Sequence, residues 1–197
     1  MREIKAAEGR LENIGNIKNN SKVILDYAHT PDALKYTLES IKEQFSHRSI
    51  KIVFGCGGDR DKDKRSIMGK IANNYCDKIF LTDDNPRYEN PKKIRNQIKK
   101  KISRSKLVEI ASREKAIKVA IKSLKSGNIL LVAGKGHEIY QEYKGKKNFF
   151  SDKKCILKAI NLKNKKLFKN WKANILHEQC NLNSVSKNLK ISKASIN

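Results

Sequence analysis

The sequence predicts an α/β fold, a Rossmann-like and mainly parallel sheet with helices on both faces. Short apolar runs recur along the chain, and each is followed by a segment of about 10–15 residues whose apolar side chains have helical spacing. Polar and turn-forming residues separate the two kinds of segment. Strands that alternate with helices form right-handed crossover units with parallel pairing. An antiparallel edge strand is compatible with this pattern.

The composition is that of one domain of ordinary size with a tail. The chain has 197 residues, of which 38% are hydrophobic and 32% charged, so a real core can form. No apolar run approaches the roughly 20 residues of a membrane span, and no secretory signal opens the chain. The cysteines are scattered with no CxxC pair, which argues against a metal site or a disulfide framework and favours a cytoplasmic location. They are Cys56, Cys76, Cys155 and Cys180.

The formal net charge of +24 raises the question of nucleic-acid binding. The lysines are spread over the whole chain, and no aromatic residues alternate with them to form a stacking surface. Such a surface attracts polyanions without specificity, so we do not expect a specific nucleic-acid partner. The same charge would attract nucleotides and other phosphorylated ligands.

The first crossover unit follows a polar lead-in segment. Residues 1–20 contain a turn but no pattern of a complete element. Residues 21–26 are apolar and end on a carboxylate, as a buried strand would. Thr30 is a good N-cap and Pro31 a good first helical residue, so we predict a helix over 31–45.

Two further units repeat this order. The second is a strand at 50–54, a glycine-rich turn and a helix at 64–75. The third is a strand at 78–82, a polar loop and a helix over about 91–103. Each strand is short and apolar, as expected for strands buried on both faces.

The remaining elements complete the predicted domain. We expect a strand at 107–110, a helix at 112–125, a strand at 128–133, a hairpin within 139–150, and a helix from 152 to about 162.

The last stretch differs in composition from the rest. Residues 21–162 carry the predicted domain, whereas 163–197 are rich in Lys, Asn and Ser and have few apolar residues. We expect this tail to be flexible, or weakly helical around 167–180, unless it opens a following domain.

The loop Thr82–Arg87 has the most distinctive chemistry. It follows a strand, where open α/β sheets bind ligands, and Pro86 stiffens it. Arg87 can grip a carboxylate, while Asp84 and Asn85 can accept from an ammonium group. Such a loop suits a zwitterion such as an amino acid. The alternative is a polar turn with Asp84 as a cap.

Three other polar loops also follow strands, and all four should converge on one edge of the sheet. Residues 55–60 combine three glycines with Arg60, for backbone approach to a ligand or for a tight turn. His29, beside Tyr27, could contact a nucleotide base or only local backbone. In residues 134–138, Glu138 could form a hydrogen-bonded pair with His137 or accept from a substrate ammonium group. Neither glycine loop completes a nucleotide-hydrolysis motif.

Taken together, these loops are distinctive. The segments DYAHTPDAL, GCGGDRDKDKR, DDNPR and AGKGHE resemble, in order, motifs of the C-terminal domain of the Mur ligases, and the likeness spans residues 8–162. In that family ATP activates a peptide carboxylate as an acyl phosphate, and the amine of an incoming amino acid attacks it to give an amide, ADP and phosphate. The DNPR motif marks members that add meso-diaminopimelate rather than lysine.

The resemblance also implies roles for individual residues. It assigns no catalytic residue and no metal ligand to this chain. It places Arg10, Asp26 and His29 on the ATP side. It implies that meso-diaminopimelate is held by Arg60, Asp84, Asn85, Pro86, Arg87, Gly134 and Glu138.

The family's UDP-sugar domain and its ATPase domain have no counterpart in these 197 residues. ATP, Mg²⁺ and UDP-MurNAc-dipeptide would be bound mostly by those domains, so we expect a fragment that does not catalyse ligation alone. Residues 175–197 resemble the opening of the next ligase of the pathway, which adds D-alanyl-D-alanine, so the chain could come from a fusion of the two. It could also be part of a folylpolyglutamate- or cyanophycin-type ligase, or a stand-alone amino-acid or nucleotide binding module.

Overall fold

A computed structural model describes residues 9–194 of the chain, and the surroundings of the side chains of residues 9–174. Its centre is a six-stranded sheet in the order β1-β2-β6-β3-β4-β5, in which β1 is antiparallel and the other strands are parallel. The strands are β1 (Glu12–Asn16), β2 (Lys22–Asp26), β3 (Ile50–Phe54), β4 (Lys78–Leu81), β5 (Leu107–Glu109) and β6 (Ile129–Ala133).

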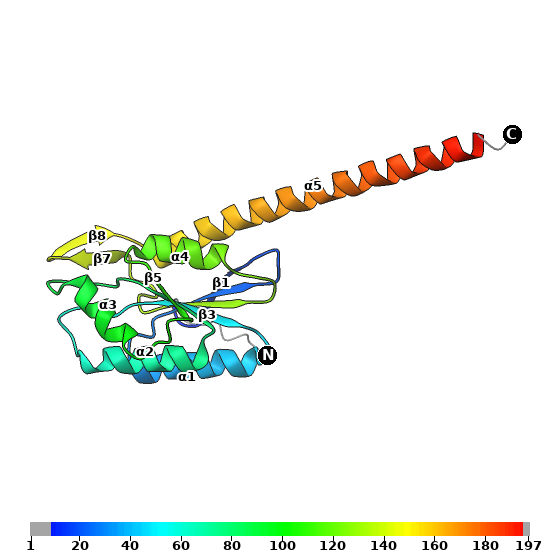
Figure 1. Ribbon diagram of the computed structural model, residues 1–197. Helices are drawn as coiled ribbons and strands as arrows, with labels where there is room; N and C mark the ends of the chain where they lie inside the picture. Colours follow the sequence, from blue (N-terminus) through cyan, green and yellow to red (C-terminus); the bar gives the residue numbers. More distant parts are fainter. Residues whose placement is uncertain (1–8, 195–197) are drawn as a thin grey trace, which may run out of the picture.

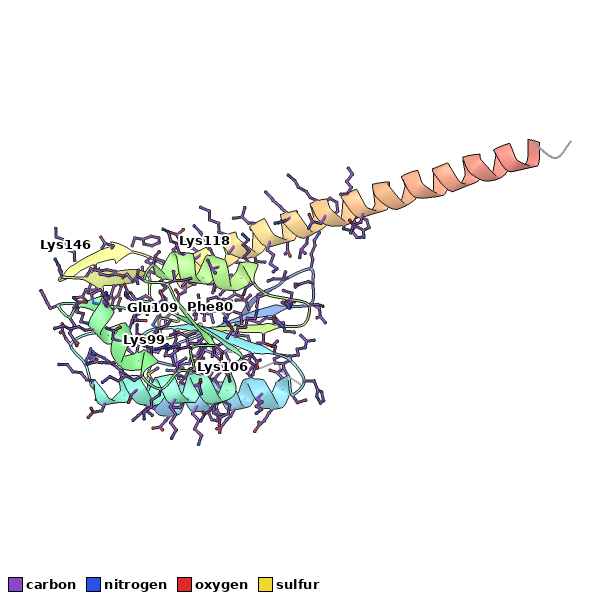
Figure 2. All side chains as sticks on the ribbon, viewed as in Figure 1. Phe80, Lys99, Lys106, Glu109, Lys118 and Lys146 are labelled. Atoms are coloured by element: carbon purple, nitrogen blue, oxygen red, sulfur yellow. The ribbon has the colours of Figure 1, made fainter. Side chains whose placement is uncertain are left out.

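Helices cover both faces of the sheet, as predicted (Figure 1). One layer is α1 (Pro31–Gln44), α2 (Asp63–Tyr75) and α3 (Pro91–Lys99), and the other is α4 (Arg113–Lys122) and the first turns of α5 (Asp152–Ala194). Neighbouring strand residues point to opposite faces, so Ile79 packs in one core and Phe80 in the other. Figure 2 shows Phe80 between the helical layers.

Local sequence signals set the helix starts. The Thr30 hydroxyl accepts a hydrogen bond from the backbone of Ala33, and Pro31 follows in the first turn of α1. Asn90 caps α3 and Ser112 caps α4 in the same way. The caps matter to function because each of these helices follows a strand and begins at the same edge of the sheet.

The predicted hairpin is present as a separate two-stranded sheet, β7 (Tyr140–Tyr143) with β8 (Lys146–Phe149). Its turn residues Lys144 and Gly145 have φ of 49° and 73°, the left-handed region that a tight hairpin turn requires. An isolated bridge joins Tyr143 to Arg87, and the Arg87 backbone bonds to both neighbours of Tyr143. The hairpin is therefore fastened to the loop after β4.

The expectation that residues 1–20 hold no complete element is wrong for residues 12–16. These form β1, which pairs antiparallel with β2 and has an irregularity between Asn13 and Gly15. Two asparagines and a glycine in five residues hide the strand, because both residue types are rare in strands. The open edge of β2 supplies the pairing instead. Residues 1–8 of the lead-in segment lie outside the described residues.

The predicted end of the last helix near residue 162 is also wrong, since α5 continues to Ala194 through the stretch expected to be flexible or weakly helical. No Gly or Pro interrupts it. Its buried apolar residues are Ile156, Ala159 and Ile160, its contacts with the domain continue through Lys163 to Leu167, and beyond them it leaves the body of the domain as a rod (Figure 1). The possible fusion rests on residues 175–197, whose side chains lie outside the described part.

Within residues 9–194, no helix combines the length and the apolar character that crossing a bilayer would require.

Candidate functional site

The loops after β2, β3, β4 and β6 surround one cavity of ≈ 410 Å³. These four strands are neighbours in the sheet and parallel, so their carboxyl ends meet at one edge. Six of the seven residues predicted for the amino-acid ligand line this cavity, together with Tyr27, Lys64 and Tyr140. The six are Arg60, Asp84, Asn85, Arg87, Gly134 and Glu138.

Pro86, the seventh, is buried behind the cavity and has a packing role. A Cβ on Gly58 would lie 1.9 Å from the Pro86 carbonyl oxygen, and a Cβ on Gly55 would lie 2.2 Å from that of Thr82. These two glycines therefore let the loops after β3 and β4 touch through their backbones. Gly55 and Gly57 also line the cavity, whereas Gly58 does not.

Asn85 joins the loops of the site. Its Oδ1 accepts from Lys135 Nζ at 2.9 Å and from the backbone of Glu142 at 3.1 Å, while its Nδ2 donates to Glu138 Oε2 at 2.9 Å. Both lone pairs of Oδ1 are thus in use. Asn85 thus accepts from the ammonium group of Lys135, its contact with a ligand stays a prediction, and the hydrogen left on Nδ2 suits a ligand oxygen.

Asp84 lines the cavity, and one oxygen of its carboxylate has no hydrogen-bond donor among the described residues. Its Oδ1 accepts from the backbone of Asn85 at 2.8 Å. Its Oδ2 is buried and accepts no hydrogen bond within the described structure, and Arg113 Nη1 stops 3.6 Å away. A buried carboxylate oxygen without a donor is costly, so a ligand ammonium group would satisfy it.

Asp83, next to it in sequence, has a structural role. It forms an ion pair with Arg95, and its Oδ2 accepts from the Tyr143 hydroxyl at 3.3 Å. Burial raises the pKa of Asp83 despite the arginine, and burial together with Asp83 raises the pKa of Tyr143 to about 12. Arg95 also binds Glu109, which Lys99 contacts at 2.8 Å, as Figure 2 lets the reader follow. The pair therefore anchors α3 to the sheet.

Glu138 rests on a buried cation. Lys135 is fully buried and donates from Nζ to Glu138 Oε2 at 2.8 Å. Burial alone would raise the pKa of Glu138, but the hydrogen bonds from Lys135 and Asn85 outweigh it and hold the pKa below its ordinary value of 4.5. Glu138 is thus an anion at neutral pH, with its side chain 20% exposed to the cavity.

Two arginines supply the basic part of the cavity. Arg87 has φ of 51° and donates from Nη1 to the Gly58 carbonyl at 2.7 Å, with Glu142 Oε2 3.7 Å from its Nε. Arg60 is exposed and makes no hydrogen bond or ion pair with the part of the chain that the structure describes. Its whole guanidinium is therefore open to a ligand carboxylate.

A brace missed by sequence reasoning holds the glycine-rich loop. Arg65 is fully buried and binds both oxygens of Glu89, at 2.9 and 2.8 Å, as well as the Gly57 carbonyl at 3.0 Å. Hydrogen bonds from Arg65 lower the pKa of Glu89 to about 2. The same carboxylate accepts from the backbone of Asp59 at 2.6 Å. The brace thus fixes the loop from which Arg60 extends.

The residues predicted for the nucleotide, Arg10, Asp26 and His29, line a second cavity of ≈ 400 Å³, with Tyr36 beside them. The carboxylate of Asp26 is already occupied by the protein, because it accepts hydrogen bonds from Leu11, Ala28 and Thr37 at 2.7, 2.8 and 3.1 Å. It fastens the segment before β1 to β2 and α1. Arg10 and His29 remain exposed at the cavity.

No cluster of three or more His, Cys, Asp or Glu side chains suited to a metal occurs among the described residues. Glu138 is held by Lys135, and Arg113 lies beside Asp84, so these two carboxylates do not fit a Mg²⁺ ion.

The comparisons with known proteins agree with this architecture. The family model described as Mur ligase, glutamate ligase domain, matches residues 9–136. A Rickettsia rickettsii protein named UDP-N-acetylmuramoyl-L-alanyl-D-glutamate–2,6-diaminopimelate ligase is 50% identical over 159 residues, which are 80% of this chain and 32% of that protein. A protein of the same name from Chlorobaculum tepidum is 44% identical over 160 residues, which are 79% of this chain and 32% of that protein.

A solved structure of a ligase with that name superposes with a TM-score of 0.73 at 40% identity, over 80% of this chain and 32% of the other. UDP-N-acetylmuramate-alanine ligase from Thermotoga maritima, at 18% identity, a TM-score of 0.53 and coverage of 85% and 32%, shares the fold. The chain spans about a third of the length of the curated relatives it matches.

Proposed function

This chain belongs to the Mur ligase family, and from that premise we propose that it is the amino-acid-binding C-terminal domain of a ligase that adds meso-diaminopimelate to UDP-MurNAc-L-Ala-D-Glu. One observation carries the proposal: four strand-end loops gather two arginines and two carboxylates around one cavity. The Rickettsia rickettsii protein and the solved ligase carry the corresponding function in their names.

The cavity matches the two charges of a zwitterionic group. Around Asp84 and Glu138, the buried cations Arg113 and Lys135 face three carboxylates, since Asp152 also binds Arg113. That group of five carries one negative charge in excess, which an ammonium group would balance. Arg60 and Arg87 would bind a carboxylate of the same ligand. Gripping one end of diaminopimelate in this way would leave the amine of its other end to attack the activated peptide.

Lysine provides the discriminating comparison. It carries one carboxylate and two amines, so it lacks the second carboxylate that a diaminopimelate end presents to the arginines. We expect calorimetry on the chain to give at least about tenfold tighter binding of meso-diaminopimelate than of lysine, the worth of one charge-assisted pair. Equal affinity for the two, or no heat with diaminopimelate, would contradict the proposal.

Ligation itself requires more than this domain. ATP chemistry activates the peptide carboxylate, and no metal cluster among the described residues would hold the Mg²⁺ that accompanies ATP. We therefore propose that the chain binds the amino acid, while UDP-MurNAc-dipeptide and ATP are bound by other domains of the enzyme. The purified chain should give no amide with these three substrates and Mg²⁺, and measurable product would refute this.

The second cavity supports a nucleotide contact. Arg10 offers a cation for a phosphate, and the Tyr27 and His29 rings, 4.6 Å apart, offer a surface for a base. We propose that this side approaches ATP held elsewhere. Arg10→Gln should weaken any ATP binding by the chain and leave diaminopimelate binding unchanged.

Ligand preference separates this proposal from a related ligase type, because a folylpolyglutamate-type domain would bind glutamate rather than diaminopimelate. A fusion to the D-alanyl-D-alanine-adding ligase remains a prediction, which coding sequence beyond Asn197 would test. We propose a cytoplasmic location, because the reaction consumes ATP and a UDP-linked precursor, and because Cys56, Cys76 and Cys155 are free thiols.

A further inference from the structure

Arg113 is a buried cation that lies next to Asp84, outside the residues that line the cavity. It is the first residue of α4, and its side chain is completely buried. Nε donates to Asp152 Oδ1 at 2.8 Å, and Nη2 donates to Asp152 Oδ2 at 2.7 Å and to the Ala133 carbonyl at 2.9 Å. Nη1 makes no hydrogen bond within the described structure, although it lies 3.6 Å from Asp84 Oδ2.

This arrangement leaves two opposite charges just short of contact. Nη1 of Arg113 and Oδ2 of Asp84 are both buried, and both lack a hydrogen-bond partner among the described residues. A direct bond at about 2.8 Å would satisfy both atoms. The two-point grip of Asp152, together with the Ala133 carbonyl, fixes the plane of the guanidinium and holds Nη1 back.

The restraint has a consequence for the ligand. If Nη1 bonded to Oδ2, the Asp84 carboxylate would be neutralised and its open lone pair filled. With Nη1 held back, the buried Oδ2 keeps a lone pair that no described residue fills, beside the cavity that Asp84 lines, while the nearby positive charge still supports the carboxylate. Oδ2 of Asp84 therefore stays unbonded because Asp152, at the start of α5, restrains the Arg113 guanidinium.

We propose that Asp152, acting through Arg113, is a positioning residue of the cavity: it holds the guanidinium short of Asp84 and so keeps Oδ2 open to accept from the ammonium group of the amino-acid ligand. This inference rests on the function proposed above. Asp152 does not line the cavity and touches no ligand itself.

The test compares Asp152→Asn with a matched charge control, Glu114→Gln, on the exposed side of the first turn of α4. Asparagine is nearly isosteric but has one acceptor oxygen in place of two, so it cannot reproduce the two-oxygen grip on Arg113. Calorimetry on the whole chain would use meso-diaminopimelate and the two enantiomers of 2-aminopimelate, each of which lacks one amine. In Asp152→Asn, affinity should fall about tenfold or more for diaminopimelate and for one enantiomer, and less than about twofold for the other.

Glu114→Gln should bind all three ligands as the unsubstituted chain does. An equal loss for all three ligands in Asp152→Asn would show a merely structural role and overturn the proposal. Absence of binding by the unsubstituted chain would instead refute the proposed function.

A second variant covers the case in which Asp152→Asn does not fold. Arg113→Met/Asp152→Asn removes both partners of the buried pair, which proteins tolerate far better than the loss of one. With no guanidinium to block Oδ2, this variant should regain the affinity that Asp152→Asn loses for diaminopimelate and for one enantiomer. If that affinity remains lost, the restraint is not the cause.

A ligand-free measurement separates the two proposals. A crystal structure of Asp152→Asn should show Arg113 Nη1 at about 2.8 Å from Asp84 Oδ2. An unchanged separation would overturn the inference, whatever the chain binds.

Discussion

Asn85 and Glu138 are 53 positions apart in sequence and are joined by a 2.9 Å hydrogen bond on the wall of the cavity. Lys135 binds both of them, at 2.9 and 2.8 Å. The loops after β4 and β6 are therefore held together by one amide, one carboxylate and one buried ammonium. Asn85 acts as a connector here, so the charged ligand contacts are left to Asp84, Glu138 and the arginines.

Lys135→Met tests this junction. The substitution keeps the length of the side chain but leaves Glu138 without its buried cation, so we expect a loss of about 3 kcal/mol in the free energy of unfolding. Urea denaturation at pH 7 would measure it. Lys146→Met, on the exposed β8 strand, is the control and should change stability by less than about 0.5 kcal/mol. A loss in Lys135→Met no larger than the control's would contradict the assigned role.

The two arginines should separate binding from stability. Arg60→Gln should weaken diaminopimelate binding about tenfold or more and leave the melting temperature unchanged, since Arg60 is exposed and pairs with no described residue. Arg87→Gln should reduce both, because Arg87 also bonds to the Gly58 carbonyl. Calorimetry and thermal unfolding of both variants would check this, and a stability loss in Arg60→Gln would show contacts other than those described.

Gly58→Ala should displace the loop after β4. The new Cβ would lie 1.9 Å from the Pro86 carbonyl oxygen, a distance that only movement of backbone can relieve. We expect a loss of more than about 2 kcal/mol together with weaker diaminopimelate binding. Gly127→Ala is the matched control, since it has φ of 73° and open space around it, and should cost only about 1–2 kcal/mol for its backbone conformation. Binding should be unaffected in the control.

Glu89 predicts a pH dependence of stability. Its pKa is lowered in the folded chain from 4.5 to about 2, first by hydrogen bonds from Arg65. A lowered folded pKa stabilises the protein at pH values above 4.5, and this contribution is lost as the pH falls from 4.5 toward 2. Glu89→Gln should therefore be less stable than the unsubstituted chain by about 2 kcal/mol at pH 7. The difference should shrink toward pH 2, and a constant difference would contradict the pairing.

The sequence predicts the parallel core well, because each buried strand is a short apolar run and the starts of α1, α3 and α4 have the caps Thr30, Asn90 and Ser112. It does not reveal β1, whose pairing comes from the free edge of β2 rather than from its own residues. The helix ends are also less certain from sequence, since α3 stops at Lys99 and not near Ser103. Where such a helix ends depends on its packing against the rest of the domain, which the local sequence does not show.

For the site, strand-end loops and residue chemistry bring six of the seven predicted residues to one cavity. The supports Arg65, Arg113 and Lys135 are missed, because a charged residue inside a helix or a glycine loop reads as solvent-exposed until the packing is known. The sequence signal that could have revealed these buried cations is the acidic partner that each one needs. Asp152 and Glu89 are acidic residues at or just before a helix start, where a capping role explains them equally well.

The helix α5 begins at Asp152 and runs for 43 residues, about 65 Å of rod, most of it clear of the sheet (Figure 1). Its docked part extends from Ile156 to Leu167, which pack in the same core as α4, and Lys163 donates to the backbone carbonyls of Lys122 and Leu124. The outer part of the helix therefore acts as a lever on the docked part. A force that a bound partner applies to the outer part would tilt the end that carries Asp152, and through Arg113 it would shift Asp84.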